Sequence, residues 1–163
     1  MTEFSRPIAA DRIGAAPVTR SVDAAPEELA ALAARLMIPS VQRLSCSFRL
    51  HRAADAIIAA EGTLSAEVTQ ICVVSLDEFT QTVSERFELE FVPEGTESEE
   101  IDVEARDQIP YANGAIDLGE AASEQLALAL DPYPKQPGAE AGAPLADEPT
   151  HPFAGLAALR LKP

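Results

Sequence analysis

The sequence has few cysteines, no long apolar run and no recognisable export signal, and each absence excludes a class of protein. Only Cys46 and Cys72 occur in 163 residues, which is too few for a disulfide scaffold, so both are expected to be free thiols. No run of 18 apolar residues occurs, which argues against a membrane-spanning helix. The N-terminal residues lack a basic region followed by an apolar one. We therefore expect a cytoplasmic protein with no membrane contact.

Basic residues are also scarce. Lys and Arg number 12 against 27 Asp and Glu, giving a formal net charge of −15. Because binding to nucleic acid depends on neutralising phosphates with cations, RNA should on average be repelled. A contact with RNA is expected to be local, or to be mediated by a basic protein.

Phosphate-binding loops and metal motifs are missing as well. The eight glycines are scattered, with no GxGxxG or GxxxxGK[ST] pattern, so nucleotide chemistry has no support and no cofactor is expected. A structural zinc site favours close pairs such as C-x-x-C, but the residue three after Cys72 is Ser75. We expect no metal site and no catalytic residue. A nucleophilic role for Cys72 has no base among its sequence neighbours, and packing is the preferred interpretation.

What the sequence does contain predicts one domain, residues 1–163, of the α+β class. Apolar residues at helical spacing predict a helix over residues 26 to 37, with Pro26 at its start, and a second over 118 to 130 with Asp117 as N-cap. Alternating patterns predict an antiparallel sheet of about four to six strands with the two helices packed on it. The strands are expected near 41–50, on both sides of a turn at Glu61 and Gly62, and over 82–92.

Three segments are expected to lie outside this core. Residues 93–115 should form an acidic, flexible loop, because seven acids and one arginine occupy 93–108. Residues 132–150 are rich in proline and should form an extended connector. Residues 151–163 should form a short C-terminal segment docked through an apolar face.

One stretch runs against the acidic composition. Residues 29 to 54 contain no acid and carry four arginines, Arg35, Arg43, Arg49 and Arg52. Arg43 and Arg49 fall on the same face of the predicted strand. One interpretation is a solvated strand whose arginines pair with carboxylates of neighbouring strands. The other is a docking patch for RNA phosphates or for an acidic protein surface.

Three motifs, in order, resemble the bacterial YceD family. GTLSAEVTQICVVSLDEF is similar to the family's strand that ends in C-x-x-C and an aromatic, with Cys72 and Phe79 matching and Ser75 replacing the second cysteine. AIDLGEAASEQLALALDPYP is similar to its acidic-leucine helix through Asp117 and Leu118. HPFAGLAALRLKP is similar to its terminal tail, and its matching residues include Pro152 and Phe153.

The resemblance implies a function that the residues alone do not. It implies a non-enzymatic ribosome-biogenesis factor that promotes accumulation or processing of the large-subunit (23S) ribosomal RNA. The implied partners are that RNA or basic ribosomal proteins. The alternatives are a generic protein-binding adaptor and, third, a small thiol enzyme or hydrolase.

Overall fold

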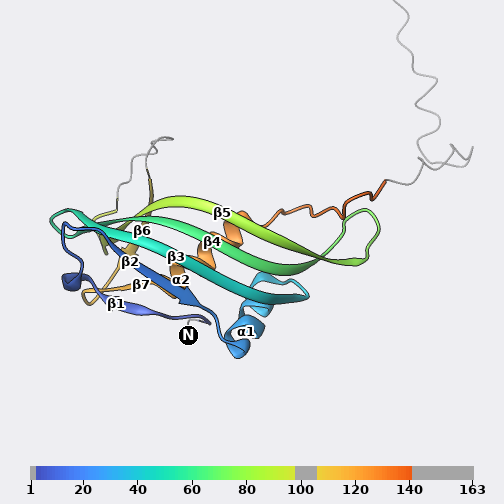
Figure 1. Cartoon of the computed structure of the whole chain (residues 1–163), viewed down its shortest axis with the longest axis horizontal. Helices are drawn as coiled ribbons and strands as arrows, with labels where there is room; N and C mark the ends of the chain where they lie inside the picture. Colours follow the sequence, from blue (N-terminus) through green and yellow to red (C-terminus); the bar gives the residue numbers. More distant parts are fainter. Residues whose placement is uncertain (1–2, 98–105, 141–163) are drawn as a thin grey trace, which may run out of the picture.

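The protein folds around one large sheet, with helices and a small ribbon on one side. A computed structural model describes residues 3–97 and 106–140. The large sheet has five strands in the order β2-β3-β4-β5-β6, and β1 pairs with β7 in a two-stranded ribbon (Figure 1). The elements are β1 (Pro7–Ala9), a short 3-10 helix (Ala10–Arg12), β2 (Val18–Asp23), α1 (Pro26–Leu36), β3 (Ser40–Ala54), β4 (Ile57–Ile71), β5 (Glu78–Pro93), β6 (Asp107–Tyr111), β7 (Ala115–Asp117) and α2 (Leu118–Ala129).

Three long strands, β3, β4 and β5, form the centre of the sheet and are antiparallel to one another. The α+β prediction is therefore confirmed, as are both helices to within one residue at their ends. The antiparallel prediction fails only at the last strand, because β6 runs parallel to β5. A short hairpin cannot join two parallel strands, and residues 94–106 separate β5 from β6 in the sequence.

The prediction of a turn at Glu61 and Gly62 is wrong. β4 runs unbroken through both residues, and the tight connection lies instead around Asp55, whose φ is +35°. Gly62 is needed for packing, since a Cβ at this position would overlap the ring of Phe87 on the adjacent strand. The Phe87 ring meets Phe48 edge to face, with centroids 5.7 Å apart. Glycine within a strand often marks a bulge, a tight bend or a close approach of this kind.

The core lies between the inner face of the sheet and the layer formed by α1, α2 and the N-terminal residues. Alternate residues of β3 and β4, from Leu44 to Leu50 and from Ala60 to Val68, point into it, as the period of two predicted. Leu32 of α1 and Leu126 of α2 are fully buried against them. Phe4, which precedes the first strand, is also fully buried, so the N-terminal segment is part of the core.

The range predicted as a flexible loop, 93–115, contains ordered pairing. Pro93 ends β5, Asp107–Tyr111 forms β6, and β7 begins at Ala115. The Tyr111 hydroxyl donates to the carbonyl of Ala56 at 2.6 Å, which fixes β6 to the sheet. Composition missed these strands because a five-residue edge strand needs only one or two anchoring side chains. Residues 98–105, where the acids are densest, lie outside the described residues.

The start of the proline-rich connector is fixed to the end of the sheet. The backbone amide of Val73 donates to the carbonyl of Pro134 at 2.9 Å. The side-chain amide of Gln70 donates to the backbone carbonyl of Asp131 at 3.2 Å. Residues 141–163, which include the predicted docked segment 151–163, lie outside the described residues.

Candidate interaction surface

The outer face of the sheet carries polar side chains along all of its long strands. Strand register places them in rows, with small hydroxyl groups at the centre and charged groups at both ends. The face comprises Ser21 of β2; Arg43, Ser45, Ser47 and Arg49 of β3; Glu61, Thr63, Ser65 and Glu67 of β4; and Thr82, Ser84, Arg86 and Glu88 of β5. Both helices pack on the opposite side of the sheet, so neither of them covers this outer face.

Two of the four arginines predicted as a patch act instead within the fold. Arg35 on α1 forms ion pairs with Glu120 at 2.7 Å and Glu3 at 3.1 Å, and the carboxylate of Glu120 raises its pKa above the usual range. Arg52 donates to three backbone carbonyls, including those of Ile13 at 3.0 Å and Asp55 at 2.7 Å. Their guanidinium groups hold distant segments together, which a linear sequence does not reveal.

Arg43 and Arg49 do share the outer face, as the strand period predicted. Arg86 of β5 joins them. It lies level with Ser47, two strands away, which places it roughly 10 Å across the sheet from β3. Arg86 falls within the strand predicted over 82–92, but only the pairing of β3, β4 and β5 brings it beside Arg49. Both line a shallow hollow of about 460 Å³ on this face.

Carboxylates offset much of this positive charge. Arg43 lies opposite Glu67, and Arg49 lies opposite Glu61, with 3.9 Å between the charged atoms. The outer face is thus a balanced surface with exposed arginines. This surface is not strongly basic. A phosphate that binds an arginine here must replace the carboxylate opposite that arginine, and such exposed ion pairs are weak.

Cys72 lies just after β4, in the turn that leads to β5. Its side chain is fully buried, as the packing interpretation requires. The sulfur also accepts the amide N–H groups of Ser75 and Gln136, each at 3.4 Å. The side chain and amide of Ser75, followed by the amide of Gln136, lower the pKa of Cys72 to about 6, against the opposing effect of burial. The packing interpretation was therefore incomplete, because the sulfur ties the turn to the connector.

This environment makes stability depend on pH. Between pH 6 and about 8.5, the unfolded thiol keeps a proton that the folded protein has released, so the free energy of unfolding should rise with pH across this window. Cys72→Ala should abolish that rise, measured as melting temperature at pH 6, 7, 8 and 9. Cys46→Ala is the matched control at pH 6, 7 and 8, since burial raises the pKa of Cys46 to about 12 and this thiol keeps its proton in both the folded and the unfolded state up to about pH 8. A melting difference between wild type and Cys72→Ala that does not vary with pH would refute this account.

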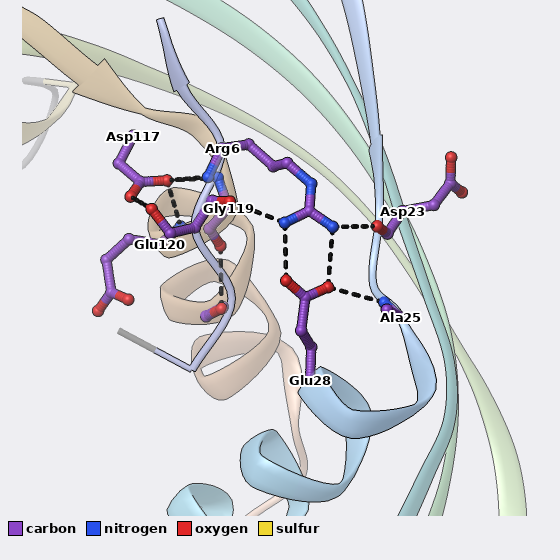
Figure 2. A network of polar contacts seen from close by, with 9 residues as sticks. Arg6, Asp23, Ala25, Glu28, Asp117, Gly119 and Glu120 are labelled. Carbon is purple, nitrogen blue, oxygen red and sulfur yellow. Dashed lines mark hydrogen bonds and ion pairs between the residues drawn. The ribbon is translucent and has the colours of Figure 1, made fainter. Parts of the chain in front are cut away.

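Asp117, which begins the acidic-leucine motif, holds the N-terminal segment against α2. Its carboxylate accepts the amides of Gly119 at 2.9 Å and Glu120 at 3.2 Å, which caps the helix as predicted. The same carboxylate accepts the Arg6 amide at 2.7 Å and the Ser5 hydroxyl. Figure 2 shows Asp117 at the centre of these contacts. The motif therefore has a structural role that its sequence did not indicate.

Arg6 extends the same network to the start of α1. Its guanidinium forms a bidentate ion pair with the carboxylate of Glu28, at 2.7 and 2.8 Å, and donates to the backbone carbonyl of Asp23 (Figure 2). Glu28 in turn accepts the amide of Ala25 at 2.7 Å, and Arg6 lowers the pKa of the Glu28 carboxyl. Residues 5 and 6 thereby join the N-terminal ends of both helices.

The remaining signature residues are part of the core or lie beyond it. Leu118 is fully buried, and Phe79 retains 8% of its surface where β5 begins. Pro152 and Phe153 lie outside the described residues. Within residues 3–97 and 106–140, no group of three or more His, Cys, Asp or Glu side chains is arranged to hold a metal ion. No helix in the same ranges is long and apolar enough to cross a membrane.

Fold and surface together define an α+β protein in which helices cover one face of the sheet and polar side chains cover the other. The family model described as large ribosomal RNA subunit accumulation protein YceD matches residues 60–160, more than half of the chain. The chain therefore belongs to the YceD family, and the match includes the strands that flank Cys72 and the helix that follows Asp117. No curated protein and no solved structure matches it.

Proposed function

We propose that the protein is a non-enzymatic ribosome-biogenesis factor that promotes accumulation of the large-subunit (23S) ribosomal RNA in the cytoplasm. Membership of the YceD family is the observation that carries this proposal. We further propose that residues 1–163 act as one domain. The pairing of β1 with β7 supports this, because it joins the start of the chain to the strand before α2.

The outer face is the surface through which we propose a direct contact with RNA. Arg43, Arg49 and Arg86 are exposed there, and Arg43 and Arg49 are roughly 20 Å apart along β3. That separation suits several phosphates of a folded RNA better than one small anion. A generic adaptor remains the second candidate, favoured by the carboxylates that balance the arginines.

Sedimentation of tagged protein against ribosomal precursors, with and without nuclease, tests the function. Comigration with large-subunit precursors is expected, together with a loss of 23S RNA when the gene is deleted. Two results together would refute the proposal. The tagged protein would stay at the top of the gradient, and a strain that lacks the gene would contain a normal amount of 23S RNA.

Charge reversal tests the RNA-contacting face. The variant Arg43→Glu, Arg49→Glu, Arg86→Glu should stay folded, because exposed ion pairs contribute about 0–1 kcal/mol each to stability. It should lose comigration with precursors, and any residual association should depend little on salt concentration. Arg12→Glu, Arg20→Glu is the control, since it reverses exposed arginines away from the outer face. Comigration of the folded triple variant equal to that of the control across a salt series would exclude this face.

A further inference from the structure

The strand β5 leaves most of one edge open. It pairs with β4 along nearly its whole length, but with β6 only from Leu89 to Pro93. Residues 78–88 therefore have no strand partner on that side among residues 3–97 and 106–140. An unpaired stretch of this length offers about 33 Å of strand edge. Open edges of this kind are templates for pairing with another chain.

The structure shows which backbone groups face outward along this edge. The carbonyl of Asp77 accepts from Cys72 on the β4 side, whereas the amide of Glu94 donates to Tyr111 on the β6 side. The register between β4 and β5 has no shift between these points, so residues alternate strictly in direction. The outward groups belong to the even-numbered residues Thr80, Thr82, Ser84, Arg86 and Glu88, all of which are exposed.

A groove lies beside this edge, between β5, the start of β6 and α2. It encloses about 470 Å³. Phe87 and Leu128 supply apolar surface, and the Leu128 side chain is 71% exposed. Glu85, Glu88 and Asp107 supply carboxylates. The side of an added strand that faces α2 would thus meet apolar contacts and negative charge together.

The charges at this edge favour one kind of occupant. A second copy of the chain would bring its own Glu85 and Glu88 against the first, and each copy carries a net charge of −15. A basic segment would instead be attracted. Arg106 already shows that a guanidinium fits here, since it pairs with Glu88 at 3.0 Å and Glu90 at 3.6 Å.

We propose that the open edge of β5, residues 78–88, binds an extended basic segment of a protein partner as an added strand. Backbone hydrogen bonds from the even-numbered residues hold the segment, and alternate side chains enter the groove. Identification of the partner as a ribosomal protein rests on the proposed function, but the edge and its chemistry do not.

Two proline variants isolate backbone pairing from charge. Ser84→Pro removes one outward N–H without touching the bonds to β4. Ser21→Pro is the matched control on the opposite edge of the sheet. Val22 pairs with Cys46 and the Ala24 amide donates to Leu44, so the amide of Ser21 faces away from β3. Proline is tolerated at such edge positions.

The probe is a labelled ten-residue peptide of alternating lysine and valine, titrated into the full-length protein at fixed salt. Ser84→Pro should weaken binding by roughly fivefold, as expected for one lost backbone hydrogen bond, and Ser21→Pro should leave it unchanged. Glu85→Gln should weaken binding and reduce its salt dependence. Equal affinity of the two proline variants would overturn the proposal.

Amide hydrogen exchange of the wild type keeps the test decisive if Ser84→Pro does not fold. The peptide should slow exchange at Thr82, Ser84 and Arg86, but not at Ser21. Protection of these amides before the peptide is added would overturn the proposal. If this protection without peptide is lost on dilution, a second copy of the chain already covers the β5 edge. If it is lost when residues 141–163 are removed, the chain's own tail covers that edge. Failure of the wild type to comigrate with ribosomal precursors would refute the proposed function but leave the peptide result standing.

Discussion

Asp117→Ala should lower the free energy of unfolding by about 4 kcal/mol, since an N-cap contributes about 1 kcal/mol and each of the two further hydrogen bonds to the charged carboxylate about 1.5. The variant loses the cap of α2 and both contacts to residues 5 and 6. The melting temperature should fall by roughly 10 °C.

Asp117→Asn and Ser5→Ala separate the two roles of this carboxylate. Asparagine keeps an acceptor for the amides of Arg6 and Gly119, so its cost should be less than half that of alanine. Ser5→Ala removes only the hydroxyl contact and should cost about 1.5 kcal/mol. If Asp117→Ala were no worse than Ser5→Ala, the carboxylate would not join the N-terminal segment to α2.

Gly62→Ala should also destabilise strongly, by about 2–3 kcal/mol, because the added methyl group forces the Phe87 ring from its place and breaks its edge contact with Phe48. The higher strand propensity of alanine offsets only a small part of this cost. Chemical denaturation gives the difference directly. Gly14→Ala is the control, since a Cβ at that position meets nothing within 4 Å.

A double-mutant cycle identifies the cause of the Gly62 effect. In a Phe87→Ala background the ring is absent, so Gly62→Ala should be close to neutral. The interaction energy should exceed about 1.5 kcal/mol, within the range for residues in contact. Additive effects would mean that the strand backbone, and not the ring, requires glycine at this position.

Sequence patterns predicted those helices and strands whose formation is determined by residues close together in the sequence. Helices α1 and α2 follow from apolar spacing together with Pro26 and Asp117, and these signals act within one or two turns of the helix. The shared face of Arg43 and Arg49 follows from the period of a strand. The two short strands after residue 106 and the strands β1 and β2 near the N-terminus were not predicted, because brief edge strands depend on their partners.

The candidate surface could be predicted only in part, for the same reason. A strand period puts Arg43 and Arg49 on one face, but the order β3-β4-β5 decides that Arg86 joins them. The neighbouring residues in the sequence do not indicate that Arg35 and Arg52 have hydrogen-bond partners within the fold. Glu120 is far from Arg35 in the chain, and Ile13 is far from Arg52.

The sequence by itself determined the fold class, both helices, the alternation of the long strands and, through three ordered motifs, the family. Tertiary structure decided what these residues do: that Gly62 makes room for a ring, that Asp117 holds the N-terminal segment, and that the sulfur of Cys72 accepts two amides. The physical reason is range. Helix and strand periods are set by backbone geometry over a few residues, whereas ion pairs, close approaches and open edges arise between segments that only the folded chain brings together.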